Sequence, residues 1–328
     1  MALYLMTGLI IVFLFLLLLL PFYYVYKLRM IFHRYLSSES IKGKVVLITG
    51  ASSGIGEHRA YEYAKRRACL VIVARRENLL REVAEKARKL GSPDVVPICA
   101  DVLMVDEDCK RFVEEAVNHF GRLDHLVNNA GISSMCLIED ATDITRFQPV
   151  MDVNFWGSIY PTYFAMPYLK RTKGSISVNA SASAYMHPSG FSIYTASKAA
   201  LLSFYETMRS EMPPEISITI ATLGLVESEM TKGKHLNREG TTEVSPELAD
   251  TLINQLPAMS TSACAKSIVE AVCRKERYVT EPKWCAVLFL LKAPCPGIIE
   301  FVNRRLHLRV KASVAKNFSM PPPENRSA

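Results

Sequence analysis

The amino-acid sequence predicts a doubly wound α/β domain, with a parallel sheet covered by helices on both faces, behind an N-terminal transmembrane helix. Three observations support this fold class. The first 26 residues carry no charged side chain. From residue 44 onward, short apolar runs alternate with longer helical patterns, which is typical of parallel strands buried on both faces. A glycine-rich segment lies between the first of these strands and the helix that follows it.

The N-terminal apolar run is long enough to anchor the chain in a membrane. As a helix, residues 3–26 would extend about 36 Å, which exceeds a hydrocarbon thickness of about 30 Å. A cleaved signal peptide would have a shorter apolar core with basic residues before it, and this run has neither. Lys27, Arg29 and Arg34 follow the run, so the positive-inside rule predicts a single-pass anchor with the rest of the chain in the cytosol. We assign residues 1–26 to the anchor and residues 27–42 to a linker.

The composition excludes several other classes of protein. A hydrophobic content of 49% with 22% charged residues is that of a folded chain. The net charge of +7 is modest, and no basic patch is interleaved with aromatic residues, so we expect no nucleic-acid partner. Basic residues beside the anchor favour contact with a lipid bilayer. The eight cysteines form no CxxC or Cys/His pattern, which predicts reduced core thiols and no metal site.

Strands and helices alternate through one predicted domain, residues 43–283. The strands are expected at residues 44–49, 69–74, 95–99, 123–128, 175–179, 216–221 and 277–280. The helices are expected at residues 55–66, 77–90, 106–120, 146–169, 194–211 and 262–274. The polar segment 233–257 lacks an apolar period, so we expect a loop that covers a site.

Residues 284–328 form a C-terminal extension with two parts. The apolar patch at residues 284–291 is too short to span a bilayer. It either packs in the core or in a homodimer, or lies on a membrane surface, and the sequence leaves these alternatives open. Residues 321–328 are predicted to be a disordered tail.

The glycine-rich segment predicts a dinucleotide site. Glycine permits a tight turn and lets backbone N–H groups approach a diphosphate, while the helix N-terminus contributes its positive dipole end. The strand–loop–helix order makes this a Rossmann-type arrangement rather than a chance cluster of glycines. The expected cofactor contacts are Gly50, Ser52, Ser53, Gly54, Ile55 and Gly56.

Two arginines at the end of the second strand indicate which dinucleotide is bound. A cofactor that lacks the 2′-phosphate usually meets an Asp or Glu at this position. Here Arg75 and Arg76 follow the strand, and guanidinium groups pair well with phosphate oxygens. The sequence therefore favours NADP(H) over NAD(H).

A tyrosine and a lysine on one helix predict acid/base chemistry. Tyr194 and Lys198 are four residues apart, so they share a helical face, and Ser181 follows the fifth strand. A nearby ammonium lowers the pKa of a tyrosine towards the working pH, which suits a group that exchanges a proton with a carbonyl or alcohol oxygen. A serine hydroxyl is able to hold that oxygen.

These motifs together resemble the short-chain dehydrogenase/reductase family. The resemblance covers residues 43–280 and rests on the glycine segment, Asn128-Asn129-Ala130-Gly131, Asn154, Ser181 and Tyr194-Thr-Ala-Ser-Lys198. Within that family, segments 43–57, 120–131 and 277–284 resemble plant 11β-hydroxysteroid dehydrogenase-like proteins, which include the steroleosins of oil bodies.

The resemblance implies a role for each matched residue. Tyr194 would donate or accept the substrate proton, and Lys198 would lower its pKa and hold the nicotinamide ribose. Ser181 would orient the substrate oxygen, and Asn154 would hold a water that links Lys198 to solvent. Other cofactor contacts would come from residues that flank the adenine or line the cofactor floor: Asp101, Val102, Asn128, Ala130 and Gly131.

The resemblance also implies an activity, namely hydride transfer between NADP(H) and a hydroxyl or keto group of a steroid or sterol-like lipid. Two alternatives remain at this stage: a reductase of another lipid ketone, of the 3-ketoacyl or sphingoid type, and a catalytically weak lipid-surface protein. The expected location is the endoplasmic reticulum or a lipid droplet. Because only Pro21 stands where steroleosins carry a proline-rich knot, a hairpin anchor in droplets is not predicted.

Four residues depart from the family pattern. They are Arg59 at a usually apolar position, Arg67 where Gly usually ends the first helix, Asn179 where Ser is common, and Leu223 in place of Pro. Arg59 shares a helical stripe with Ile55 and Tyr63, so we expect it to face the sheet and to be paired or to extend outward. We expect Arg67 to adopt positive φ, and both Arg59→Leu and Arg67→Gly to stabilise the chain.

Overall fold

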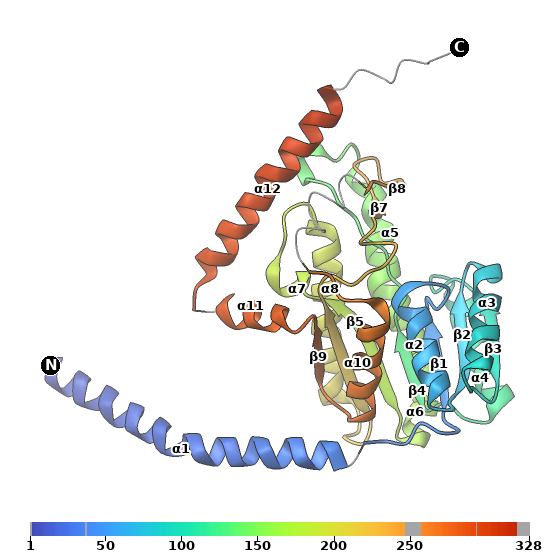
Figure 1. Cartoon of the computed structure of the whole chain (residues 1–328), viewed down its shortest axis with the longest axis horizontal. Helices are drawn as coiled ribbons and strands as arrows, with labels where there is room; N and C mark the ends of the chain where they lie inside the picture. Colours follow the sequence, from blue (N-terminus) through green and yellow to red (C-terminus); the bar gives the residue numbers. More distant parts are fainter. Residues whose placement is uncertain (1, 37, 247–256, 293, 320–328) are drawn as a thin grey trace.

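A parallel sheet of seven strands forms the centre of the computed structural model, which describes residues 2–36, 38–246, 257–292 and 294–319. The strand order is β3-β2-β1-β4-β5-β6-β9, and every pairing in it is parallel (Figure 1). The strands are β1 Val45–Thr49, β2 Cys69–Ala74, β3 Val95–Cys99, β4 His125–Asn128, β5 Ser175–Ser181, β6 Ser217–Leu223 and β9 Tyr278–Glu281. The predicted doubly wound fold is confirmed.

Helices cover both faces of the sheet because the central strands are apolar on both sides. One face packs against α2 Gly54–Lys65, α3 Glu77–Lys89 and α10 Thr261–Cys273. The other face packs against α4 Lys110–Phe120, α6 Gly157–Thr172 and α8 Ser192–Glu211. Two apolar cores result, one on each side of β1 and β4.

The strand order reverses between β1 and β4, and this reversal positions the functional cleft. β1 pairs with β2 on one side and with β4 on the other, so the loops that follow β1 and β4 turn to opposite faces of the sheet. A crevice opens at the carboxyl ends of the strands where such loops part. The glycine segment and residues 128–131 border this crevice.

The helix expected at residues 146–169 is divided into four turns and helices. A 3₁₀ turn, η3 Ile144–Phe147, leads into α5 Gln148–Met151, a π-helical turn η4 Asp152–Trp156 and then α6. Asn154 lies in the π-helical turn, which is a form that often marks functional sites. A second π-helical turn, η1 Val105–Cys109, precedes α4, and a 3₁₀ turn, η2 Ile138–Asp140, follows β4.

The segment expected to be an irregular loop, residues 233–257, instead contains a short antiparallel hairpin. β7 Lys234–Leu236 pairs with β8 Thr242–Val244. Gly233 has a φ of +96° and Gly240 a φ of +69°, so glycine makes both turns possible. The strands were missed because they are only three residues long and mostly polar. Residues 247–256 lie outside the described part of the chain.

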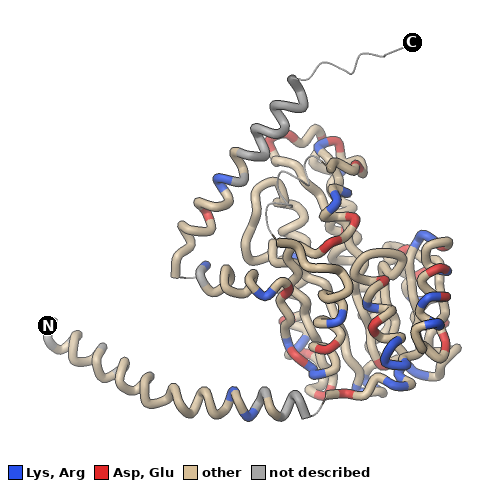
Figure 2. Tube along the Cα trace, in the orientation of Figure 1, with Lys and Arg blue, Asp and Glu red and all other residues tan. Residues whose placement is uncertain are grey.

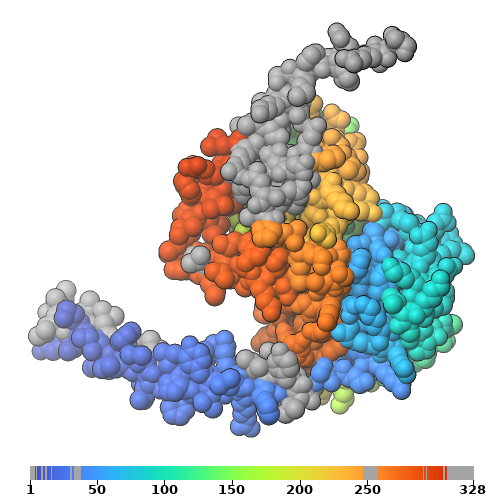
Figure 3. All heavy atoms as spheres, in the orientation of Figure 1, coloured from blue at the N-terminus to red at the C-terminus, as the bar shows by residue number. Residues whose placement is uncertain are grey.

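The N-terminal helix extends away from the sheet, as Figure 3 shows in blue. It is α1, Ala2–Leu36, and its segment Met6–Arg29 is long and apolar enough to cross a membrane. The helix continues past the predicted anchor to Leu36, and Lys27 and Arg29 lie in the half of the helix that is nearer the domain (Figure 2). After the helix, Glu39 donates its backbone N–H to the carbonyl of Cys273, and Ile41 is buried.

The C-terminal extension begins as helices rather than as an irregular tail. α11 Trp284–Lys292 includes the predicted apolar patch, and α12 Pro296–Ser319 follows it; α7 Ser183–Met186 lies nearby. Cys285 is buried and the rings of Phe289 and Tyr185 lie 4.5 Å apart, whereas Leu290 is exposed. One face of α11 therefore packs on the domain and the other faces outward. The predicted tail, residues 321–328, lies outside the described residues.

Two of the departures from the family pattern have clear structural outcomes. Arg67 lies two residues after the last residue of α2 and has a φ of 61°, so the predicted positive φ is confirmed. Arg59 faces the sheet as its stripe predicts, and it is paired: its guanidinium donates to Asn179 and Ser177. The expected gain from Arg59→Leu does not follow, because leucine would leave both buried acceptors without a donor.

Candidate active site

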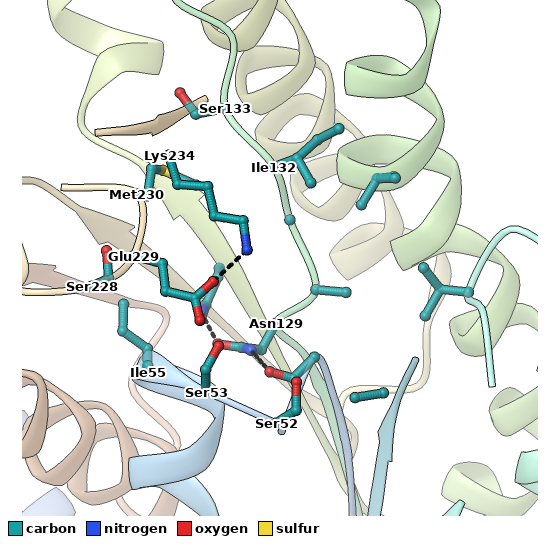
Figure 4. Close-up of a pocket in the computed structure, with 18 of the residues that line it drawn as sticks. Ser52, Ser53, Ile55, Asn129, Ile132, Ser133, Ser228, Glu229, Met230 and Lys234 are labelled. Carbon is teal, nitrogen blue, oxygen red and sulfur yellow. Dashed lines mark hydrogen bonds and ion pairs between the residues drawn. The ribbon is translucent and has the colours of Figure 1, made fainter. Parts of the chain in front are cut away.

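A cleft of about 380 Å³ lies at the carboxyl ends of the strands, where the sheet topology places it. The glycine loop, the ends of β2 and β4, and the loop after β6 form its walls. Figure 4 shows side chains from these segments turned towards one another, with Ser52, Ser53 and Asn129 facing Glu229 and Lys234. Tyr194 and Lys198 from α8 also line it.

The glycine loop forms a cradle that side chains would fill. A β-carbon on Gly50 would lie 2.8 Å from the Cα of Ala130, and one on Gly56 would lie 2.3 Å from the Gly50 carbonyl oxygen. Gly50 and Gly54 both have positive φ. Ser53 caps α2 without a side-chain hydrogen bond, so the first N–H groups of the helix stay free for an anion. This geometry fits the diphosphate of a dinucleotide.

The segment 128–131 divides its functions between cleft and core. Asn128, predicted to line the cofactor floor, is buried and donates to the hydroxyls of Thr162 and Tyr205 in the core. It is absent from the cleft lining, whereas Ala130 and Gly131 belong to it. Asn129, which we did not select from the sequence, donates to the carbonyls of Thr49 and Gly50 and so holds the glycine turn. The sequence could have indicated Asn129, because it lies between Asn128 and Ala130 in the segment that resembles the family motif.

The two arginines line the cleft beside the glycine loop. Arg76 donates to the hydroxyls of Ser52 and Ser53 and forms an ion pair with Glu229 at 2.8 Å. Arg75 is largely exposed, and its guanidinium lies 3.6 Å from Asp101.

Asp101, Glu229 and Lys234 are further charged residues of the cleft lining. Val102 also lines the cleft, and the contact of Asp101 and Val102 with the adenine stays a prediction. Glu229 and Lys234, which the sequence analysis did not select, are paired at 2.7 Å. Hydrogen bonds from Lys234 and Arg76 lower the pKa of Glu229 to about 2.

Tyr194 and Lys198 line the cleft, and Ser181, which is not part of its lining, is hydrogen-bonded to Tyr194. Ser181 is the last residue of β5, and Tyr194 and Lys198 lie one turn apart on α8. The Lys198 ammonium lies 5.9 Å from the centre of the Tyr194 ring and donates to the backbone carbonyl of Asn179 at 2.9 Å. The Ser181 hydroxyl donates to the carbonyl of Leu223 at 3.3 Å.

Burial controls the titration of both α8 side chains. It raises the pKa of Tyr194, and the hydrogen bond with Ser181 opposes this rise. It lowers the pKa of Lys198 to about 8. The lowering of the tyrosine pKa by Lys198, which the sequence pattern suggests, stays a prediction.

Asn154 has protein partners at both polar atoms. Its side-chain oxygen accepts from the N–H of Ile132, and its NH₂ group donates to the Ile132 carbonyl and to the Ser197 hydroxyl. A β-carbon on Gly131 would lie 3.1 Å from the Asn154 oxygen and 3.5 Å from the Lys198 nitrogen, so the three residues adjoin. The predicted water link to Lys198 stays a prediction.

The catalytic-site motifs and the fold agree with one protein family. Residues 44–239, well over half of the chain, match the family model of the short chain dehydrogenases. The chain belongs to the short-chain dehydrogenase family.

Plant members of this family are close in sequence. The chain is 53% identical over 288 residues to 11-beta-hydroxysteroid dehydrogenase 1A of Arabidopsis thaliana, covering 88% of this chain and 82% of that protein. It is 47% identical over 324 residues to 11-beta-hydroxysteroid dehydrogenase A of Arachis hypogaea, covering 94% and 93%. The similarity therefore extends beyond the dehydrogenase domain into both terminal segments.

Solved short-chain dehydrogenase structures share the fold. A short chain dehydrogenase/reductase from Burkholderia phymatum in complex with NAD superposes with a TM-score of 0.70 at 21% identity, covering 79% of this chain and 96% of that one. An alcohol dehydrogenase from Thermococcus sibiricus complexed with 5-hydroxy-NADP gives a TM-score of 0.60 at 22% identity, covering 73% and 96%.

Proposed function

We propose that this short-chain dehydrogenase is a membrane-anchored, NADP(H)-dependent enzyme that interconverts a hydroxyl and a keto group on a steroid or sterol-like lipid. The observation that carries the proposal is that Tyr194 and Lys198 line a cleft whose glycine cradle suits a dinucleotide, with Ser181 hydrogen-bonded to Tyr194. When bound, the cofactor supplies or accepts the hydride.

The proposed chemistry assigns one task to each residue. Tyr194 is buried, and its raised pKa keeps it protonated, so it is suited to donate a proton to a substrate carbonyl oxygen. Ser181 holds that oxygen through its hydroxyl. Lys198 holds the nicotinamide ribose and lowers the pKa of Tyr194 once substrate and cofactor exclude water from the site.

The preference for NADP(H) rests on Arg75 and Arg76. Both lie beside the end of β2, where the adenine ribose of a dinucleotide is held in this fold. Arg76 already bonds the glycine-loop serines, so its guanidinium lies within the proposed cofactor site. Arg75 keeps a largely exposed guanidinium available for a 2′-phosphate.

The lipid substrate class follows from the relatives and from the anchor. Five plant relatives that are 47–53% identical carry the name 11-beta-hydroxysteroid dehydrogenase. An apolar helix able to cross a membrane would hold the enzyme where lipophilic ketones partition. We propose the endoplasmic reticulum or a lipid droplet as its location, with the catalytic domain in the cytosol.

The test uses the full chain in detergent micelles, with NADPH consumption measured against ketosteroids, 3-ketoacyl thioesters and a sphingoid ketone. We expect turnover with a ketosteroid, and Tyr194→Phe should reduce it by about 10²–10⁴-fold because the proton donor is lost. NADPH should still bind to that variant and quench the fluorescence of the protein. Turnover confined to the other two ketones would contradict the steroid assignment, and an unaffected Tyr194→Phe would contradict the mechanism.

A further inference from the structure

Arg59 is a buried cation whose charge no neighbour balances. It is the largest side chain among the fully buried ones, with an exposed fraction of 0%. Among the described residues, Arg59 forms no ion pair with a carboxylate, and its Nε atom has no hydrogen-bond partner. Burial lowers the pKa of Arg59, and the Tyr63 side chain only partly offsets this lowering. An unbalanced buried charge is costly, so this residue is a poor choice for packing alone.

The guanidinium bonds two neutral acceptors on β5. One terminal nitrogen donates to the side-chain oxygen of Asn179 at 2.8 Å, and the other donates to the hydroxyl of Ser177 at 2.6 Å. Arg59 and Asn179 contact each other although they are 120 positions apart in the sequence. The two residues therefore form one structural feature rather than two independent ones.

Asn179 links Arg59 to two parts of the proposed active site. Its NH₂ group donates to the side-chain oxygen of Asn129 at 2.6 Å, and Asn129 in turn donates to the carbonyls of Thr49 and Gly50, each at 3.1 Å. Its backbone carbonyl accepts from the ammonium of Lys198. One residue thus connects the buried arginine with the glycine turn and with the catalytic helix.

The chemistry of arginine fixes the direction of this chain of hydrogen bonds. A guanidinium only donates, so the oxygen of the Asn179 amide must face Arg59 and its NH₂ group must face Asn129. That sets the oxygen of Asn129 towards Asn179 and its NH₂ group towards the carbonyls of Thr49 and Gly50. If both amides were reversed, two donors would meet at Arg59 and the Asn129 oxygen would face two carbonyl oxygens.

We propose that Arg59 is a positioning residue, which orients the Asn179 and Asn129 amides and so holds the glycine turn in the shape that binds the cofactor diphosphate. The turn is sensitive to such support, because Gly50 has positive φ and any β-carbon on Gly56 would lie 2.4 Å from the Asn129 amide nitrogen. The expected effect on NADPH affinity rests on the proposed function. The expected effect on the structure of the glycine turn in the free protein does not.

The first experiment measures the free protein. Hydrogen exchange of segment 49–56 should be severalfold faster in Arg59→Met, which removes the donors, than in the parent chain. Arg59→Lys keeps a donor-only cation and should restore slow exchange. Arg66→Met, a change on the same helix at a partly exposed residue paired with Glu62, is the matched control and should leave the segment unaffected. Equal exchange in all four proteins would overturn the inference.

The second experiment measures NADPH affinity by fluorescence quenching, at a temperature where circular dichroism shows each variant folded. Arg59→Met should raise the Kd for NADPH about tenfold, as expected for the loss of one buried charged hydrogen bond. Arg59→Lys should lie close to the parent, as should Arg66→Met. A general loss of packing would lower the melting temperature without weakening NADPH binding in Arg59→Met alone. An unchanged Kd for NADPH in folded Arg59→Met would contradict the proposal.

Two further outcomes can be distinguished, namely an Arg59→Met variant that does not fold and a parent chain that does not bind NADPH. If Arg59→Met does not fold, Asn179→Ser interrupts the same link to Asn129 while leaving Ser177 as an acceptor for Arg59, and it should show the same faster exchange and weaker binding. If the parent chain itself does not bind NADPH, the proposed function fails, whereas the exchange of segment 49–56 in the free protein still decides the role of Arg59.

Discussion

At the residue scale, burial determines the chemical state of the central side chains. It raises the pKa of Tyr194 and lowers that of Lys198 to about 8, so both shifts favour the neutral form. The two groups lie one helical turn apart in the same enclosed space, and a protonated tyrosine is suited to donating a proton to a ketone. The arginines beside the glycine loop remain exposed enough to meet a charged ligand.

The cofactor preference is testable at these arginines. Replacing Arg75 and Arg76 together by Ala should weaken NADPH binding about 10–100-fold, as expected for lost charge-assisted hydrogen bonds, while NADH binding changes little. Titration of both cofactors into the purified chain measures this. Arg81→Ala, an exposed arginine paired with Glu77 on α3, is the control. Equal losses for the two cofactors would show that neither arginine contacts the 2′-phosphate.

At the element scale, helix ends determine where the chain departs from an ideal geometry. Arg67 lies two residues after the last residue of α2 and has a φ of 61°, immediately before Ala68 and β2. The Arg67 carbonyl accepts from the N–H of Gly43, which holds the entry to β1 against the exit from α2. The conformation is needed for this connection, so the arginine tolerates it at a cost in free energy.

Arg67→Gly should therefore stabilise the protein. A β-carbon at positive φ costs about 1 kcal/mol, and relieving it should raise the melting temperature by about 2–4 °C for a domain of this size. Thermal unfolding without cofactor is the measurement. Arg66→Gly is the matched control, because Arg66 has a φ of −91° and glycine there should give no gain. A melting temperature of Arg67→Gly at or below the parent's would show that the arginine is accommodated without strain.

At the scale of the whole molecule, the proposed membrane location rests on the two ends of the chain. Segment Met6–Arg29 is apolar enough to span a bilayer, and basic residues follow it. At the other end, α11 and α12 carry exposed apolar side chains, among them Leu290, Phe301 and Leu308. The catalytic domain lies between these segments in the sequence.

The proposed cytosolic orientation is testable through the acceptor sequences at Asn317 and Asn325. We expect no glycan on either, because a cytosolic domain does not meet the glycosylation machinery. Protein from the native membrane should show no shift in mobility after glycosidase treatment. An acceptor placed in an extension before Met1 should be modified, which serves as the positive control. A shift in the unmodified chain would reverse the orientation.

Much of this protein was predictable because local pattern and tertiary structure agree. Strands with continuous apolar runs gave the parallel sheet, and the order of strand, glycine loop and helix gave the dinucleotide cradle. The spacing of Tyr194 and Lys198 placed them on one face of a helix, and the structure brings Ser181 to them. These features depend on short-range spacing or on strand burial, which the sequence displays directly.

The remaining features depended on contacts between distant segments. Arg59 and Asn179 are 120 positions apart, and each by itself looked like a defect in the family pattern; only the packing of α2 on β5 shows that they are partners. Asn128 donates hydrogen bonds to Thr162 and Tyr205 in the core and does not line the cleft, because the fold brings these two hydroxyls next to it. The Arg76–Glu229–Lys234 pairs likewise join the second strand to a hairpin of weak local pattern. Hydrogen-bond partners are fixed by where the folded chain brings each donor and acceptor together, so only the tertiary structure decided them.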